Sequence, residues 1–146
     1  MVEVVKSAIV LHSTDEMFHL VNDVVSYPEF LKWCVKGTVH HQEGDYYEAT
    51  LDMSVKGVNV SFMTANRKED RSGVLHLDLQ LKKGPFKALH GHWAFKPLGD
   101  MGCRVSLLLN YEVKSSMINQ LFAKGFERIA ERMVSDFVKR AGQLYA

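Results

Sequence analysis

The sequence predicts an α+β fold in which a curved antiparallel sheet of about six or seven strands wraps around one long C-terminal helix. Three observations support this helix-grip arrangement. A β-branched segment opens the chain, residues 35–113 repeat apolar side chains with period two, and residues 115–144 repeat them at spacings of three and four. Two short helices are expected directly after the first strand.

Length and charge limit what the chain can do. Its 146 residues, 47% of them hydrophobic, suit one domain with one core, so we expect a single domain over residues 1–146. Eighteen basic residues against 17 acidic ones leave a net charge of +1. That balance lacks the broad positive field of a non-specific nucleic-acid binder, so no DNA partner is expected, although a local basic patch is compatible with it.

The N-terminus and the two cysteines indicate in which cellular compartment the protein is found. Glu3 stands where a signal peptide carries bases, and the apolar run around it is too short to span a bilayer. Cys34 and Cys103 form no disulfide or zinc pattern, which suits a reducing compartment. We expect a cytoplasmic protein, at most peripheral at the inner membrane.

The first strand and the two short helices follow from local patterns. Residues 2–11 are β-branched and apolar on both faces, which predicts a strand that is covered on both sides or that lies inside a strongly bent sheet. Ser13 or Thr14 then caps a helix that continues to about Asn22. A shorter second helix is expected over residues 26–31.

Alternation defines the remaining strands. The expected inward-facing rows are Tyr47, Ala49, Leu51, Met53 and Val55; Val58, Val60 and Phe62; Leu75, Leu77, Leu79 and Leu81; Leu89, Gly91, Trp93 and Phe95; and Val105, Leu107, Leu109, Tyr111 and Val113. Glycine-containing turns separate these runs. Gly91 inside a strand predicts a bend or bulge that helps the sheet to curl.

The C-terminal helix is expected to cover the apolar face of the sheet. Ser115 or Ser116 caps it, and it should end near Leu144. Its apolar side carries Ile118, Leu121, Phe122, Phe126, Ile129, Met133, Val134, Phe137, Val138 and Ala141. Its other side carries Lys124, Glu127, Arg128, Glu131, Arg132, Asp136, Lys139 and Arg140. A curved sheet around one helix leaves a space that either core side chains or a ligand must fill.

Residues 27–34 form an aromatic corner, because they place large apolar side chains where a polar loop would be expected. Pro28 fixes its own backbone and biases Tyr27 away from helical geometry, so this segment should be stiff. From the residues alone, the corner is either a core plug or the rim of an apolar cavity.

The sequence contains no clear catalytic or metal-binding pattern. His40, His41, His90 and His92 lack a carboxylate or cysteine at ligand spacing, so no metal is expected. Cys34 has no local base to activate it. The chain contains no phosphate-binding loop, nucleophile elbow or metalloprotease motif, so we expect no catalytic residue and no enzyme activity.

Two segments carry a resemblance to a known family. Tyr27-Pro28-Glu29-Phe30-Leu31-Lys32-Trp33-Cys34 resembles the Y-P-x-F-L-P-W-C signature of the coenzyme Q-binding and ribosome association toxin family, within the lipid-transfer START-like superfamily. The segment 84–98, with Gly84-Pro85-Phe86 and Trp93, is similar to the second block of that family. The final helix is similar too, so the resemblance covers essentially the whole chain.

The resemblance implies that residues 1–146 form one START-like ligand-binding domain without a metal or covalent cofactor. It implies that a hydrophobic isoprenoid quinone, ubiquinone, or another lipid binds in the central cavity, with transient contact to a membrane surface, and that the protein carries quinone for respiratory electron transport. The expected cavity mouth is Tyr27, Pro28, Phe30, Leu31, Lys32 and Trp33. The expected cavity lining is Leu51, Met53, Phe62, Leu79, Trp93, Leu107, Phe122, Phe126 and Met133.

Two alternatives remain open. Bacterial members of this family are described as toxins that bind the large ribosomal subunit and block subunit joining, which would require an exposed basic cluster. Candidates for such a cluster are Arg67, Lys68 and Arg71, or Lys82, Lys83 and Lys87. A cyclase, also found in the superfamily, would need ionisable groups inside the cavity. Lys32 replaces the proline of the family signature, which removes one rigid residue from the corner.

Overall fold

The structure is a computed structural model, and it describes residues 1–145. Its elements, in chain order, are β1 (Val2–Val10), α1 (Thr14–Asn22), the 3-10 helix η1 (Val24–Glu29), β2 (Cys34–Glu43), β3 (Tyr46–Val55), β4 (Val58–Arg71), β5 (Val74–Lys83), β6 (Phe86–Pro97), β7 (Cys103–Val113) and α2 (Met117–Leu144).

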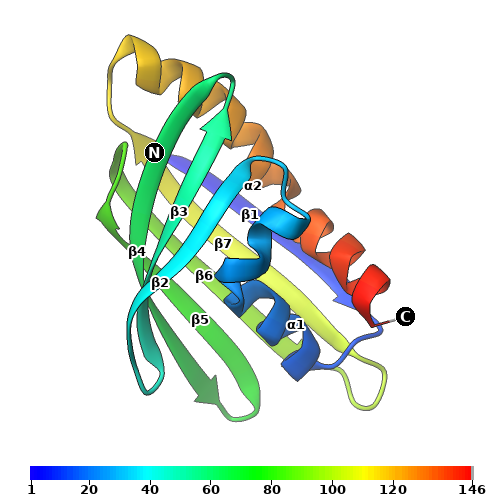
Figure 1. Cartoon of the computed structure of the whole chain (residues 1–146). Coiled ribbons are helices and arrows are strands. Elements are labelled where there is room, and N and C mark those ends of the chain that lie inside the picture. The colour runs from blue at the N-terminus through cyan, green and yellow to red at the C-terminus, as the bar shows by residue number, and fades with distance from the viewer. Residues whose placement is uncertain (146) are drawn as a thin grey trace.

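The seven strands form one antiparallel sheet in the order β1-β7-β6-β5-β4-β3-β2. Figure 1 shows α2 lying lengthwise along this curved sheet, with α1 and η1 near the C-terminal half of the helix. The α+β helix-grip fold, the two short helices and the long closing helix predicted from the sequence are therefore confirmed.

The period-two pattern places one side of each inner strand in the core. Leu77 of β5 pairs with Trp93 of β6, which in turn pairs with Leu107 of β7, and all three side chains are buried. Such a row of cross-strand neighbours on one face is what stabilises an antiparallel sheet. The inward rows were predicted correctly because alternation alone determines which face a side chain takes.

α1 begins with a complete capping box. The Ser13 hydroxyl accepts a hydrogen bond from the Glu16 backbone N–H at 3.1 Å, and the Glu16 carboxylate accepts one from the Ser13 N–H at 2.9 Å. The predicted start and end of this helix are both confirmed.

The second short helix differs from its predicted range. It is the 3-10 helix η1, which begins at Val24 rather than Ser26 and ends at Glu29. Gly37 sets this position, because a Cβ there would lie 2.0 Å from the Val24 carbonyl oxygen. Only glycine allows β2 to approach η1 so closely.

The first strand is neither covered on both sides nor inside the sheet, so both predicted positions are wrong. Val4 and Val10 are buried, but Val5 and Ile9 on the opposite face are 65% and 62% exposed. β1 is an edge strand, and the covering helix α2 lies only on the inner face of the sheet. Among residues 1–145 no second layer covers the outer face.

α2 follows its predicted range, with Ser116 as the N-cap accepting from the Asn119 N–H at 3.0 Å. Its expected apolar side is buried or partly buried from Phe122 onward, whereas Ile118 and Leu121 are exposed. In Figure 1 the first turn of the helix lies beyond the ends of β6 and β7. Within residues 1–145, no helix has the length and apolar character needed to cross a membrane.

Gly91 is not a bulge. The β6–β7 register is continuous from Ala88 to Pro97, and its irregularity lies at Phe86. A Cβ on Gly91 would lie 3.1 Å from Leu79 and 3.4 Å from Leu109, so this glycine makes room for side chains of the two neighbouring strands.

Two aromatic clusters hold α2 against the sheet. Phe137 packs edge-on against Tyr27, Phe30 and Trp93, with ring centroids 5.3 to 5.5 Å apart. Nearer the start of the helix, Phe122, Phe126, Phe62, Phe86 and Tyr111 form the second cluster. Edge-to-face pairs of this kind stabilise a core beyond their buried area.

Candidate functional site

A cavity of about 90 Å³ lies between the sheet and α2. Phe137 of the first aromatic cluster and Phe126 of the second both contribute to its wall. It is lined by Val21, Val24, Tyr27, Trp33, Tyr47, Ala49, Leu51, Phe62, Thr64, Asn66, Leu77, Leu79, Leu89, Trp93, Leu107, Leu109, Phe126, Met133 and Phe137. None of these side chains carries a carboxylate, an imidazole or a basic group, so the cavity is apolar with a few neutral polar atoms.

Those polar atoms are concentrated on β3 and β4. Asn66 is 2% exposed, and its side-chain oxygen accepts a hydrogen bond from the Thr64 hydroxyl at 2.6 Å. Tyr47 is 5% exposed, and its hydroxyl has no hydrogen-bond partner. Burial raises the pKa of Tyr47 to about 12. The Asn66 side chain lies near the hydroxyl without reaching hydrogen-bond geometry and opposes that rise, and the phenol is neutral at ordinary pH.

Seven of the nine side chains expected to line the cavity are on its wall: Leu51, Phe62, Leu79, Trp93, Leu107, Phe126 and Met133. The structure places the other two elsewhere in the core. Phe122 packs against Phe86 and Phe126 at the far end of the sheet, and Met53 is buried opposite Cys34, where β2 begins. Alternation predicts which face a residue occupies, but not its position along the strand relative to the cavity.

An outer groove of about 600 Å³ lies between the aromatic corner and α2. It is lined by Pro28, Glu29, Phe30, Leu31, Lys32, Trp33, Gly125, Arg128, Ile129, Arg132, Asp136, Lys139, Arg140 and Gln143. Five of the six residues expected at a cavity mouth are on this groove. The sixth, Tyr27, lines only the interior cavity, and Trp33 lines both.

The groove is basic. Its lining includes five basic side chains, Lys32, Arg128, Arg132, Lys139 and Arg140, against two acidic ones, Glu29 and Asp136. Arg140 pairs with Glu29 at 3.2 Å and lies over the Phe30 ring at 5.2 Å, so one cation is fixed in the wall. The groove thus combines positive charge with the apolar surface of the aromatic corner.

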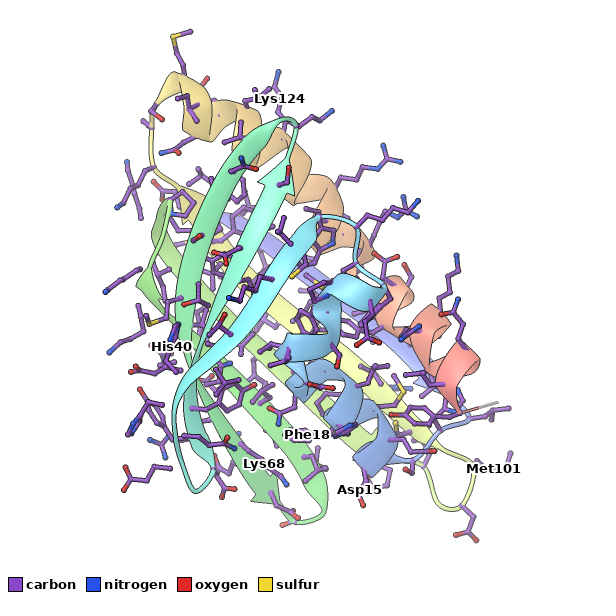
Figure 2. The ribbon with its side chains drawn as sticks, in the orientation of Figure 1. Asp15, Phe18, His40, Lys68, Met101 and Lys124 are labelled. Atoms are coloured by element: carbon purple, nitrogen blue, oxygen red, sulfur yellow. The ribbon has the colours of Figure 1, made fainter. Side chains whose placement is uncertain are left out.

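The basic clusters named in the sequence analysis are more nearly balanced. Arg71 pairs with Glu69 at 3.0 Å, and Lys82 pairs with Glu48 at 3.4 Å. Figure 2 labels Lys68 and Phe18 near one another, and the Lys68 ammonium lies 4.9 Å from the centre of that ring. The groove therefore has the more concentrated positive charge.

Histidines lie together on the outer face of β5 and β6. His76 Nδ1 lies 2.8 Å from His92 Nε2, and His90 Nε2 lies 2.7 Å from Asp78 Oδ1. Burial opposes ionisation of Asp78, but the hydrogen bonds from His90 and His92 outweigh it and lower the pKa of that carboxyl. Among residues 1–145 no group of three or more ligating side chains has metal-binding geometry.

Both cysteines are buried thiols. Burial is the largest cause that raises the pKa of Cys34 to about 11, and burial also raises the pKa of Cys103. A thiol with a raised pKa is a poor nucleophile at neutral pH.

Two parts of these sites are not predicted from the sequence. Thr64 and Asn66 continue the inward row that ends at Phe62, so the same alternation extended by four residues would have found them. Arg128 and Arg132 are predicted only to lie on the side of the helix opposite its apolar side. Their role as a groove wall depends on the aromatic corner lying opposite them, which no local pattern reveals.

Comparisons with known proteins agree with this architecture. The family model described as "Polyketide cyclase / dehydrase and lipid transport" matches residues 10–138. The chain belongs to this family. The antiparallel sheet around one long helix is also the fold of a solved structure, the Zhui aromatase/cyclase from Streptomyces sp. R1128. That structure superposes with a TM-score of 0.81 at 13% identity and covers 99% of this chain and 96% of its own, a similarity that concerns the fold alone.

Within the polyketide cyclase / dehydrase and lipid transport family, two relatives bear directly on the resemblance. The chain is 40% identical over 145 residues to the ribosome association toxin RatA of Vibrio cholerae, covering 99% of each chain. It is 25% identical to the mitochondrial coenzyme Q-binding protein COQ10 homolog B of Xenopus laevis, over 99% of this chain and 59% of that protein. The family resemblance predicted from the two motifs is confirmed.

Proposed function

We propose that this protein binds the large ribosomal subunit and blocks its joining with the small one. The observation that carries the proposal is the groove between the aromatic corner and α2, with its five basic and two acidic side chains. The full-length similarity to a protein named as a ribosome association toxin supports it.

The groove suits the backbone of ribosomal RNA. Lysine and arginine side chains that neutralise phosphates release condensed counterions, and this term dominates non-specific affinity for nucleic acid. Arg128 and Arg132 are one helical turn apart on α2 and face the same groove as Lys32. Phe30 and Trp33 add aromatic surface on which an unpaired base can stack.

Co-sedimentation with purified large subunits across a salt series tests the proposal. The wild-type protein should pellet with the subunits at low salt, and its binding should weaken as salt rises, with a logarithmic slope of up to about −4 if all five cations contact phosphate. An Arg128→Gln, Arg132→Gln double variant should bind more weakly. Its salt dependence should also be less steep, by the amount expected for the loss of two phosphate contacts.

The control variant is Lys82→Gln, Lys83→Gln, which removes the same amount of charge from the other candidate basic cluster, that of Lys82, Lys83 and Lys87. It should bind as the wild type does. If this control loses binding and the groove variant does not, the interface is on β5 and not in the groove. No association of the wild type at low salt would overturn the proposal itself.

A second candidate function is favoured by the internal cavity, which is separate from the groove's charges. We infer that a lipid with a ring head group, ubiquinone being the expected one, binds between the sheet and α2, so that the protein carries quinone in the cytoplasm or at the inner membrane surface. The apolar lining and the coenzyme Q-binding relative support this inference. The cavity of about 90 Å³ must widen toward the groove to accept an isoprenoid tail.

Organic extraction of purified protein, followed by mass spectrometry, tests the second function. Ubiquinone should be recovered in a stoichiometric amount from the wild type. A Leu79→Trp variant, which fills the cavity, should carry less of it while retaining ribosome binding. If neither the extracted protein nor protein loaded with ubiquinone vesicles contains quinone, the lipid function is wrong.

A further inference from the structure

The Tyr47 hydroxyl is an unsatisfied polar group inside the core. It is buried, has no hydrogen-bond partner, and lies on the wall of the cavity between the sheet and α2. A buried hydroxyl without a partner is costly, because it has lost its hydrogen bonds to water. Such a group is retained where something supplies the missing partner.

The neighbours of Tyr47 limit what that partner is. Thr64 donates its hydrogen to the side-chain oxygen of Asn66, so this oxygen is occupied and the amide N–H groups of Asn66 remain as donors. Tyr47 adds a further donor from the same two strands. The wall where Tyr47 of β3 pairs with Asn66 of β4 thus offers hydrogen-bond donors, and most of the remaining lining is apolar.

We propose that this wall of the cavity binds the carbonyl oxygen of a one-ring ketone or quinone, with Tyr47 donating the orienting hydrogen bond. A carbonyl oxygen has two lone pairs and can accept from both Tyr47 and Asn66. The apolar ring then contacts aliphatic side chains such as Leu79 and Leu107. This inference rests on the proposed lipid function of the cavity and adds which atom of the ligand is recognised.

Size limits the ligand to a single ring. A cavity of about 150 Å³ lined by apolar side chains holds benzene, whereas this one measures about 90 Å³. Met133 is the lining residue that can move, because it is only partly buried and its unbranched side chain has several rotamers. Its movement would add the missing volume without disturbing the strands.

A matched pair of probes tests the proposal: cyclohexanone, which has the carbonyl, and methylcyclohexane, which has the same ring without it. Binding is followed by the NMR shifts of the Leu79 and Met133 methyl groups, which report on this cavity alone. Wild-type protein should bind both. Tyr47→Phe should weaken cyclohexanone binding roughly fivefold, the effect of one hydrogen bond, and leave methylcyclohexane binding unchanged.

The unliganded variant provides an independent readout. Because the Tyr47 hydroxyl is unpaired, Tyr47→Phe should leave the melting temperature of the free protein unchanged or raise it. A large fall would mean that the hydroxyl has a partner in the free protein, and it would overturn the proposal. So would equal effects of Tyr47→Phe on both probes, which would leave the cavity as a site for ordered water.

The two cavity proposals fail separately. If ubiquinone is never recovered but cyclohexanone binds selectively, the quinone function is wrong and the carbonyl site stands. If ubiquinone is recovered equally from the wild type and from Tyr47→Phe, and cyclohexanone shows no selectivity, the carbonyl site is wrong and the quinone function stands.

Discussion

The Tyr27 hydroxyl donates a hydrogen bond to the backbone carbonyl of Val21 and thereby joins the aromatic corner to α1. Val21 is the penultimate residue of that helix, where carbonyls lack partners within the helix. Tyr27 also packs against Phe137 of α2 at 5.3 Å. One side chain therefore fixes the position of η1 relative to both helices.

Tyr27→Phe should lower the free energy of unfolding by about 1–2 kcal/mol, because the buried Val21 carbonyl loses its partner while the ring packing is kept. Urea denaturation followed by circular dichroism measures the loss. Tyr46→Phe is the control, since the Tyr46 hydroxyl bonds only to Glu48 near the surface and its removal should matter less. Equal losses in the two variants would contradict this account.

Gly125→Ala should destabilise the protein by about 1–3 kcal/mol. A Cβ at this position of α2 would lie 2.1 Å from Val55 Cγ1, so the β3–β4 hairpin would have to move. Gly142, in the last turn of the same helix, has no atom near its Cβ position. Gly142→Ala should therefore be neutral or stabilising by up to about 1 kcal/mol, the difference in helix propensity. Thermal unfolding of both variants checks the contrast.

Lys32→Pro should weaken association with the large ribosomal subunit by the loss of one positive charge, without closing the cavity. Lys32 lines the groove but not the cavity. Lys32→Gln removes the charge without adding a ring, so the two variants should show the same salt dependence of co-sedimentation. A quinone content that changes in Lys32→Pro and not in Lys32→Gln would show that the rigidity of the family proline gates the cavity.

Stability should fall as the pH decreases from about 7 to about 5.5. Partial burial and the nearby His92 and Arg71 lower the pKa of His76 below 6.5, while Glu69 and Asp70 act in the opposite direction. The unfolded chain therefore takes up the proton first, which favours unfolding as pH falls through about 6.5. His76→Asn should flatten this slope in urea titrations at several pH values. An unchanged slope would show that other groups cause it.

The fold was predictable because its determinants are local. Capping at Ser13 and Ser116 and the alternation through Leu77, Trp93 and Leu107 follow from residues near one another in the chain. The exposed outer face of β1 could not be predicted, because strand order decides which strand lies at an edge.

The candidate sites were predictable only in part, for a related reason. Seven side chains on the cavity wall follow from the inward rows and the helix face, but Phe122 lies too far along α2 to reach it. The basic groove joins Lys32 to Arg128, Arg132 and Lys139, which are about a hundred residues away in the sequence. Contacts of that separation are fixed by packing, not by spacing.

Trp33 lines both the outer groove and the inner cavity, so the two compartments share one side chain. A molecule that moves this side chain when it enters the cavity also changes the shape of the groove. Thermodynamic linkage then requires reciprocity: the factor by which cavity occupancy alters affinity at the groove equals the factor by which groove occupancy alters affinity in the cavity. In such a protein, the amount of bound lipid and the fraction bound to the ribosome would be coupled, so that a change in one would change the other.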